Sequence, residues 1–261
     1  MLLTDGCPNT PEDLRVYESS ILDVSSGEMI NLDAKLKLAT EEISEIVLNI
    51  LLDHSSVLTG GDILRRSKGV SDVVVTRQLK RWHALHTLAI FYRDAYNDQL
   101  NDRYLAKWNE YQLLERGARE ITLQYGIGLV TTPIPEPGTP VLGAAPGLLP
   151  AAIYYVQITW VSATGVEGNP SKATVYEAPV ASLLTVTNGT GLCGTPVPAI
   201  ATGFNVYIGP TDATTTLQNS TPIAIGHTFT EAATGLLAGA PAGTGQSPDL
   251  YVTGGSVLRR G

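Results

Sequence analysis

Two histidines, His83 and His86, are three residues apart, so an α-helix would place both on one face. Histidines paired in this way can bind a metal ion, but zinc hydrolases of this type also carry a glutamate within an H-E-x-x-H motif. The chain has no glutamate in that position and no cysteine nearby. We therefore interpret the pair as ordinary helix-surface or interface histidines and expect no metal site.

Other residues of reactive type also lack the partners that catalysis needs. The serine of GTGQSPD (Gly243–Asp249) has no histidine in a recognisable relation to it, and the carboxylate pairs Glu41/Glu42 and Asp98/Asp102 fall on predicted polar faces. The G-x-S-x-G nucleophile motif and the Walker A loop are absent. The sequence therefore predicts no enzyme, no catalytic residue and no cofactor.

The charges of the 261-residue chain are concentrated in its first half. Residues 1–130 hold 14 of the 17 Lys and Arg residues and 19 of the 25 Asp and Glu residues, whereas residues 131–261 are rich in Thr, Ala, Gly and Pro. This division favours two domains. The formal net charge of −8 argues against specific nucleic-acid binding, which needs a cationic surface. We interpret the basic segments Ile63–Gly69 and Arg77–His83 as a solvated loop and helix faces.

Residues 1–130 have the periodicity of a helical bundle. Thr10 and Pro11 predict a first helix that ends near Leu22. Apolar residues at spacings of three and four predict three longer helices, which begin near Asn31–Asp33, at Ser71 or Asp72, and near Asp102. The last helix is predicted to end at Tyr125 before a glycine, and its apolar face to include Leu105, Trp108, Tyr111, Ala118, Ile121 and Tyr125. Ser55–Asp72 is predicted to be a long loop that is ordered on a partner, and Asn97–Asp102 a break.

Many of the apolar positions on these helices are aromatic. Core packing explains most of them, but Tyr and Trp are also enriched at protein interfaces. The C-terminal segment Tyr251–Gly261 ends in two apolar residues and two arginines, which suits a docking peptide that binds an apolar pocket beside acidic groups. The candidate interface residues are therefore Trp82, Tyr92, Tyr96, Trp108, Tyr111, Val257, Leu258, Arg259 and Arg260. No apolar run is long enough for a membrane helix.

The second half is predicted to be built of strands. Thr131–Pro150 contains six prolines, which predict an extended linker. Tyr154–Val161 alternates with period two, and further strand segments follow at Lys172–Ala178, Ser182–Gly191, Gly203–Pro210 and Pro222–Glu231. The predicted fold class is therefore α+β multidomain: a helical bundle over residues 1–130, a linker over 131–150, an antiparallel β-sandwich over 151–250 and a tail over 251–261.

Three segments of the second half resemble fibronectin type III-like modules. They are YYVQITWVSATGVEGNPS (Tyr154–Ser171), GFNVYIGPTD (Gly203–Asp212) and HTFTEAATGL (His227–Leu236). In an ordinary module the strand that resembles Tyr154–Val161 comes last, whereas here it precedes Phe204–Ile208. The resemblance implies a fibronectin type III-like sandwich with a permuted strand order.

The helical half, above all AIFYRDAYNDQLNDRYLAKWNEY (Ala89–Tyr111), is similar to the head–tail connector, or adaptor, proteins of tailed phages. The resemblance implies a structural virion protein at the neck, made in the host cytoplasm. It implies a homo-oligomeric ring, a dodecamer, that contacts the portal protein and a tail or tail-terminator protein. We expect the purified protein to be monomeric or weakly associating until it meets its partner.

Two alternatives remain open from the sequence. The first is a phage tail or surface adhesin whose β-sandwich binds a glycan or a host protein, with Tyr155 or Tyr207 stacking on sugar rings. The second is an enzyme, such as a cell-wall hydrolase with an accessory β-domain. The single copy of the module and the lack of coiled-coil heptads argue against the first, and the missing catalytic constellation argues against the second.

Overall fold

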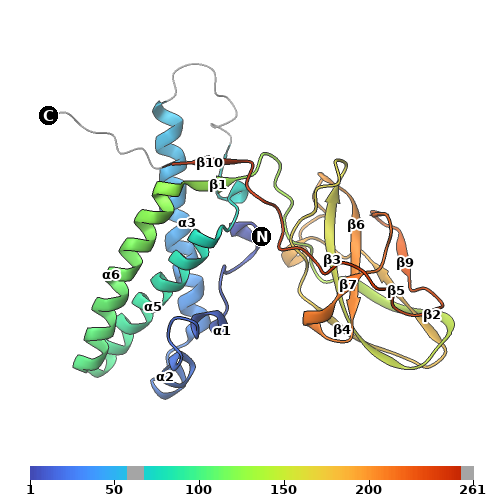
Figure 1. Cartoon of the computed structure of the whole chain (residues 1–261), viewed down its shortest axis with the longest axis horizontal. Helices are drawn as coiled ribbons and strands as arrows, with labels where there is room; N and C mark the ends of the chain where they lie inside the picture. The colour runs from blue at the N-terminus through green and yellow to red at the C-terminus, as the bar shows by residue number, and fades with distance from the viewer. Residues whose placement is uncertain (58–67, 254–261) are drawn as a thin grey trace. The chain divides into compact units, whose positions relative to one another are not determined.

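A computed structural model describes residues 1–57 and 68–253 of the chain. The chain forms two compact units, one helical and one built of strands (Figure 1). The β unit consists of Met1–Asp5 and Thr132–Ser247, and the helical unit of Gly6–Thr131 together with Pro248–Gly261. The backbone therefore passes between the units three times, after Asp5, after Thr131 and after Ser247.

In the residues that the structure describes, the helical unit contains three long helices and two short ones. The helices are α1 (Pro11–Leu14), α2 (Ile21–Gly27), α3 (Leu32–Val57), α5 (Arg77–Gln99) and α6 (Asp102–Tyr125), with a 3-10 turn, η2, at Val70–Asp72. The central helix α5 packs against both α3 and α6. The predicted apolar faces of α3 and α5 are buried, including Leu36, Ala39, Ile43, Val47 and Leu51 on α3 and Leu79, Trp82, Leu85, Ala89 and Tyr92 on α5.

Capping residues fix where the helices begin. Thr10 caps α1 in a capping box with Asp13, as its position before Pro11 predicts. The predicted extent of this helix is wrong, because it ends at Leu14 and the segment predicted to stop it, Ser25–Gly27, lies within α2. Ser and Gly fit the last turn of a helix as well as a loop, so composition alone could not separate the two.

The predicted start of the third helix at Ser71 or Asp72 is also wrong. Both residues lie in η2, and α5 begins at Arg77 with Thr76 as its N-cap. Val73 and Val74 lie between these elements, where Val73 forms a β-bridge to Leu129 and Val74 donates its N–H to the carbonyl of Gly128. These long-range backbone hydrogen bonds hold the segment extended, so α5 begins later in the chain than predicted. Part of the predicted loop Ser55–Asp72 lies outside the described residues.

The predicted break between the last two helices is confirmed. Leu100 adopts a left-handed conformation with φ of 50°, which ends α5. Asn101 then caps α6, since its Oδ1 accepts the N–H of Arg103 at 3.0 Å. The far end of α6 is closed by Gly126, which has φ of 96°.

A two-stranded antiparallel ribbon completes the helical unit. It pairs β1 (Ile127–Leu129) with β10 (Leu250–Val252). The first two residues of the predicted tail, Tyr251 and Val252, are therefore paired in a strand, and the side chain of Val252 is buried. Val257, Leu258, Arg259 and Arg260 lie outside the described residues.

The β unit contains two antiparallel sheets. The first has the order β2 (Val141–Leu149), β5 (Ser182–Thr187), β9 (Thr228–Thr230). The second has the order β4 (Thr174–Ala178), β3 (Ala152–Ser162), β6 (Ala201–Gly209), β7 (Thr216–Leu217), with β8 (Ile223–Ala224) also on β6. Short 3-10 turns are η1 (Leu3–Asp5), η3 (Leu192–Gly194) and η4 (Asp212–Thr214).

One hydrophobic core receives side chains from both sheets. The alternating residues of the opening strand point into it as predicted, namely Tyr154, Val156, Ile158 and Trp160 on β3, and they meet Leu184 and Val186 of β5 and Phe204, Val206 and Ile208 of β6. The indole N–H of Trp160 is buried without a hydrogen-bond partner among the described residues. The predicted mixed helix-and-strand layout is thus observed, with helices first and antiparallel sheets second.

The predicted proline-rich linker is instead part of the β unit. β2 lies within Thr131–Pro150 and pairs with β5, and Ile134 is buried in the core. Proline is tolerated at Pro146 because β2 is an edge strand, and an extended spacer and an edge strand share the same backbone geometry. The N-terminal segment also belongs to this unit, since the Asp5 carboxylate accepts the backbone N–H of Glu136 at 2.9 Å.

Candidate functional site

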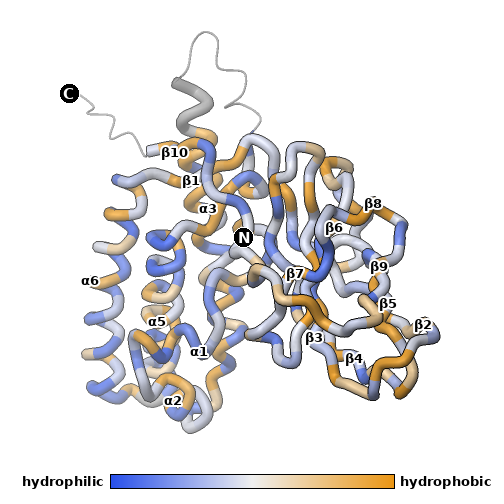
Figure 2. The backbone as a smooth tube through the Cα atoms, turned by 45° about the vertical axis from the view of Figure 1, so that its right-hand side comes forward, coloured by the Kyte–Doolittle hydropathy of each residue, from blue (hydrophilic) through white to orange (hydrophobic). Residues whose placement is uncertain are grey.

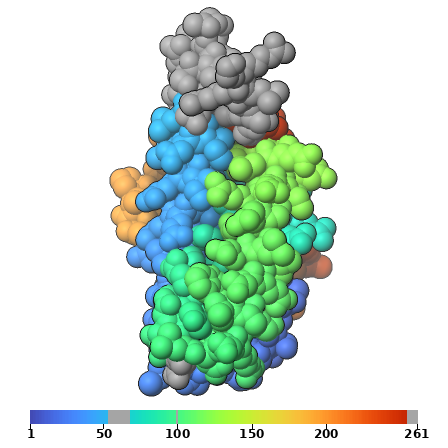
Figure 3. Space-filling view, turned by 90° about the vertical axis from the view of Figure 1, so that its left-hand side faces the viewer, coloured from blue at the N-terminus to red at the C-terminus, as the bar shows by residue number. Residues whose placement is uncertain are grey.

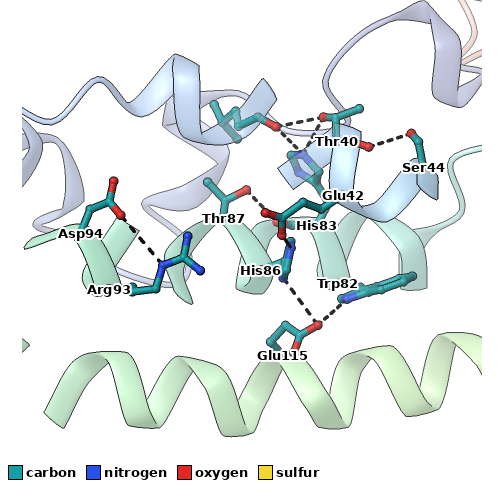
Figure 4. A network of polar contacts seen from close by, with 11 residues as sticks. Thr40, Glu42, Ser44, Trp82, His83, His86, Thr87, Arg93, Asp94 and Glu115 are labelled. Carbon is teal, nitrogen blue, oxygen red and sulfur yellow. Dashed lines mark hydrogen bonds and ion pairs between the residues drawn. The ribbon is translucent and has the colours of Figure 1, made fainter. Parts of the chain in front are cut away.

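The prediction that His83 and His86 are helix-surface or interface histidines is wrong for His83, which is a core residue. His83 projects from α5 (Figure 4) and is fully buried. Its Nδ1 accepts from Nδ2 of Asn9 at 2.9 Å, and its Nε2 donates to the carbonyl of Leu36 at 3.1 Å. Burial lowers the pKa of His83 to about 4, so the ring is neutral near pH 7. Both ring nitrogens are already engaged, which leaves this ring no lone pair for a ligand.

His86 joins the three long helices. Its Nε2 lies 2.8 Å from Glu42 on α3, and its Nδ1 lies 3.6 Å from Glu115 on α6, which also accepts from Nε1 of Trp82 at 2.8 Å (Figure 4). Among the residues that the structure describes, no group of three or more His, Cys, Asp and Glu side chains is arranged to hold a metal ion. The arrangement supports a clamp between helices rather than a reaction centre.

Three of the five predicted aromatic interface residues are core residues. Trp82, Tyr92 and Tyr111 are buried, and the rings of Tyr92 and Tyr111 stack at 5.5 Å. The hydroxyl of Tyr111 donates to Glu18 at 3.0 Å, so its polar end is satisfied within the unit. These rings are therefore not available to a partner, and their interpretation as interface residues is corrected.

The other two aromatic residues form a pair at the end of the unit where α5 and α6 are joined. Tyr96 and Trp108 are half-buried, and their rings stack at 6.2 Å. Their exposed edges remain accessible to a partner. Because each already covers the other, they add little apolar surface to the outside of the unit.

The uncovered apolar surface lies at the opposite end of α6. Ile121 and Tyr125, which the periodicity assigned to the buried face, are 41% and 65% exposed. The face that α6 buries contains Tyr104, Tyr111, Ala118 and Thr122 instead. Hydrophobic and hydrophilic residues alternate along α6 (Figure 2), so its sequence supports two apolar faces and only packing decides between them.

These exposed residues line an open groove of about 610 Å³ in the helical unit. Its walls come from α1 and the residues after it, from the first turns of α5, and from the last turns of α6. The lining includes Asp13, Val16 and Tyr17; Arg77, Lys80 and Arg81; and Ala118, Ile121 and Tyr125. Val16 is 84% exposed, so apolar surface is present on the α1 wall as well as on the α6 wall.

The polar side chains of the groove are predominantly cationic. Lys80 is paired with Asp13 at 3.3 Å, and although burial opposes it, the Thr10 N–H and Lys80 lower the pKa of that carboxyl. Arg77 and Arg81 are exposed, and neither forms an ion pair with any residue the structure describes. They stand one turn apart at the N-terminal end of α5, where no acidic residue offsets the helix dipole.

The groove can therefore bind a segment that offers both carboxylates and apolar side chains. The basic segment Arg77–His83 was the sequence signal for it, but was interpreted only as a solvated helix face. The apolar wall at Val16 and Tyr17 was missed because α1 was expected to continue past these residues.

The β unit offers less to a ligand than its sequence indicated. Tyr207 is buried, and its hydroxyl donates to Glu167 at 2.7 Å, so it is not exposed for stacking on a sugar. Tyr155 is half-buried on β3. Of the two residues predicted to stack on sugar rings, only Tyr155 is thus partly accessible.

Comparison of the chain with protein-family models, with curated proteins and with solved structures found no match. None of the helices that the structure describes is long and apolar enough to cross a membrane.

Proposed function

We propose that this chain is a structural protein of the tailed-phage neck, a head-to-tail connector that joins the portal to the tail. The observation that carries the proposal is the open groove, where exposed Val16, Ile121 and Tyr125 adjoin Arg77 and Arg81, which form no ion pair with any described residue. Apolar surface of this kind, rimmed by charge, is typical of a site that another protein covers. It lies in the unit whose sequence resembles connector proteins.

In this proposal the helical unit makes the contacts that build the ring, and the β unit is attached to it without forming the ring. The β unit is a fibronectin type III-like sandwich whose two sheets share the core around Trp160, with the strand that resembles the family's last one placed early in the chain. Copies of the helical unit form a homo-oligomeric ring, a dodecamer by resemblance, on the tail-facing end of the portal. Weak contacts repeated around a ring add up to a stable joint.

Sedimentation velocity with the portal protein of the same phage tests the proposal. Alone, the protein is expected to sediment as a monomer or a weakly associating species, and with the portal to shift into a fast boundary containing both proteins. Ile121→Asp, in the groove, is expected to reduce this shift. Leu113→Asp, at an exposed residue of α6 that does not line the groove, is the matched control. A stable dimer that ignores the portal would refute a connector role.

A further inference from the structure

α3 presents a second surface with properties opposite to those of the groove. Its exposed stripe runs along one line of the helix, at Lys37, Glu41, Glu45 and Leu48, since residues three and four apart share a face. Glu41 pairs loosely with Lys37 at 3.9 Å, and Glu45 has no ion pair among the described residues. Leu48 is 39% exposed. The stripe is therefore acidic at Glu41 and Glu45, which are about one turn apart, and apolar at Leu48.

The stripe and the groove match in spacing as well as in charge. Arg77 and Arg81 are four residues apart on α5, and Glu41 and Glu45 are four residues apart on α3, so both pairs span about 6 Å of helix. Leu48 continues the stripe by about one turn beyond Glu45. A helix laid along the groove with its glutamates on the arginines would bring this leucine toward apolar groove wall.

The two surfaces belong to different parts of the helical unit. None of the α3 residues whose side chains the structure describes lines the groove, and α5 packs against both α3 and α6. In Figure 3, α3 (blue) and α6 (green) run along different sides of the face shown. One copy therefore cannot fill its own groove with its own stripe, whereas neighbouring copies can do so in turn. A contact between two different surfaces of identical chains propagates head to tail, which is what a closed ring requires.

We infer that the groove of one copy binds the α3 stripe of a second copy, with Glu41 and Glu45 placed on Arg77 and Arg81. The inference rests on the proposed ring and names the contact that builds it. A polyanion such as nucleic acid is a poorer occupant, because two arginines on a chain of net charge −8 give little counterion release.

Charge reversal followed by mixing tests the pairing. One variant carries Arg77→Glu with Arg81→Glu, and the other carries Glu41→Arg with Glu45→Arg. All four residues are exposed, so both variants should fold, which circular dichroism checks. At low ionic strength, sedimentation velocity of the wild type is expected to show weak, concentration-dependent association. Each variant alone is expected to associate at least about tenfold more weakly, because like charges then meet.

The mixture gives the diagnostic result. Each variant's groove then matches the other's stripe, so an equimolar mixture is expected to recover association in species that contain both chains equally. Arg116→Glu with Arg119→Glu, an equal charge change at exposed residues outside the groove, should associate like the wild type.

Association of either variant at the wild-type level would overturn the inference, as would a mixture no more associated than its components. A wild type that stays monomeric at every concentration would also overturn it. If the wild type still binds the portal in those cases, the connector role stands without this contact. If it self-associates through these residues but ignores the portal, the pairing stands and the connector role fails.

Discussion

The hydroxyl of Tyr154 donates to Oε1 of Glu231 at 2.9 Å, while Oε2 of the same carboxylate accepts the backbone N–H of Leu184 at 3.0 Å. Tyr154 lies on β3 and Leu184 on β5, which belong to different sheets. Glu231 is buried just after β9, so one carboxylate connects both sheets inside the β unit. Burial, together with this hydrogen bond, raises the pKa of Tyr154 to about 12, so the phenol stays protonated near neutral pH.

Tyr154→Phe is expected to destabilise the β unit by about 1–3 kcal/mol, because the buried carboxylate loses a donor that water cannot replace. Urea denaturation followed by tryptophan fluorescence measures the effect, since Trp160 lies in the same core. Tyr155→Phe removes a hydroxyl without a hydrogen bond to any described residue from the same strand and should change the stability by less than about 0.5 kcal/mol. Equal effects of the two variants would show that the bond to Glu231 contributes nothing.

The helical unit is expected to lose stability in mild acid because of His83. Burial lowers the pKa of His83 to about 4 from the ordinary value of 6.5, so between these values the unfolded chain binds a proton that the folded chain excludes. Its contribution is therefore fully present above pH 6.5 and is lost as pH falls toward 4, by about 3 kcal/mol in total.

Comparison with His83→Gln isolates this contribution from that of the carboxylates. The difference in unfolding free energy between wild type and variant should shrink steadily as pH falls from 7 to 4. His227→Gln, which changes an exposed histidine of the β unit, should keep the wild-type pH dependence. A constant difference between wild type and His83→Gln across this range would contradict the assignment of His83 as a buried neutral ring.

Gly128→Ala is expected to disrupt the β1–β10 ribbon. A Cβ at this position would lie 2.7 Å from Cγ of Pro248, which is closer than real Cβ contacts, and 3.1 Å from Cγ2 of Thr76, which is a tight contact. We expect a loss of about 1–3 kcal/mol, as for other overpacked sites. Hydrogen exchange of the Asp249 N–H reports on the ribbon, because this N–H donates to the carbonyl of Leu129 on β1.

Gly117→Ala is the matched control, because the same atom added in the middle of α6 meets nothing within 4 Å. It should stabilise the unit by about 0.5–1 kcal/mol through helix propensity. If both alanines behaved alike, the close approach of Pro248 to β1 would be wrong.

Leu100→Gly is expected to stabilise the junction between α5 and α6. Leu100 has φ of 50° and is 72% exposed, so its side chain gains little contact while its backbone is strained. Glycine removes the strain, and we expect a gain of about 0.5–1 kcal/mol in chemical denaturation after the entropy of the unfolded chain is included. Leu100→Ala keeps a Cβ and should show no such gain; an equal gain from alanine would point to removal of the exposed side chain as the cause.

Local signals accounted for much of the fold. The bounds of α6 follow from Asn101 and Gly126, and the buried face of β3 follows from strict alternation. Signals that depend on distant partners failed. β2 looked like a spacer because only pairing with β5 distinguishes the two, and the start of α5 shifted because Val73 and Val74 bond to residues beyond α6.

The groove could not be predicted for the same reason, because it depends on how distant segments pack. Ile121 and Tyr125 have helical spacing, and nothing in the sequence of α6 says that α1 ends too early to cover them. Trp82, Tyr92 and Tyr111 were assigned to an interface for the converse reason: their residue types suit both interfaces and cores, and only the packing of α5 on α6 buries them. The charges of Arg77 and Arg81 were visible, but their lack of partners was not.

The three backbone passages between the units have a practical consequence for anyone who wishes to cut the molecule. A single proteolytic cut between Thr131 and Thr132 would leave the connections after Asp5 and after Ser247 intact, so the two folded units would still migrate together under native conditions. Expression of residues 131–261 alone would omit Met1–Asp5, and with it the Asp5 carboxylate that accepts the backbone N–H of Glu136. It would also retain β10, which belongs to the helical unit. A self-contained β unit calls for a circular permutant, with Ser247 spliced through a short connector to Met1, whose nitrogen already reaches the Thr244 carbonyl.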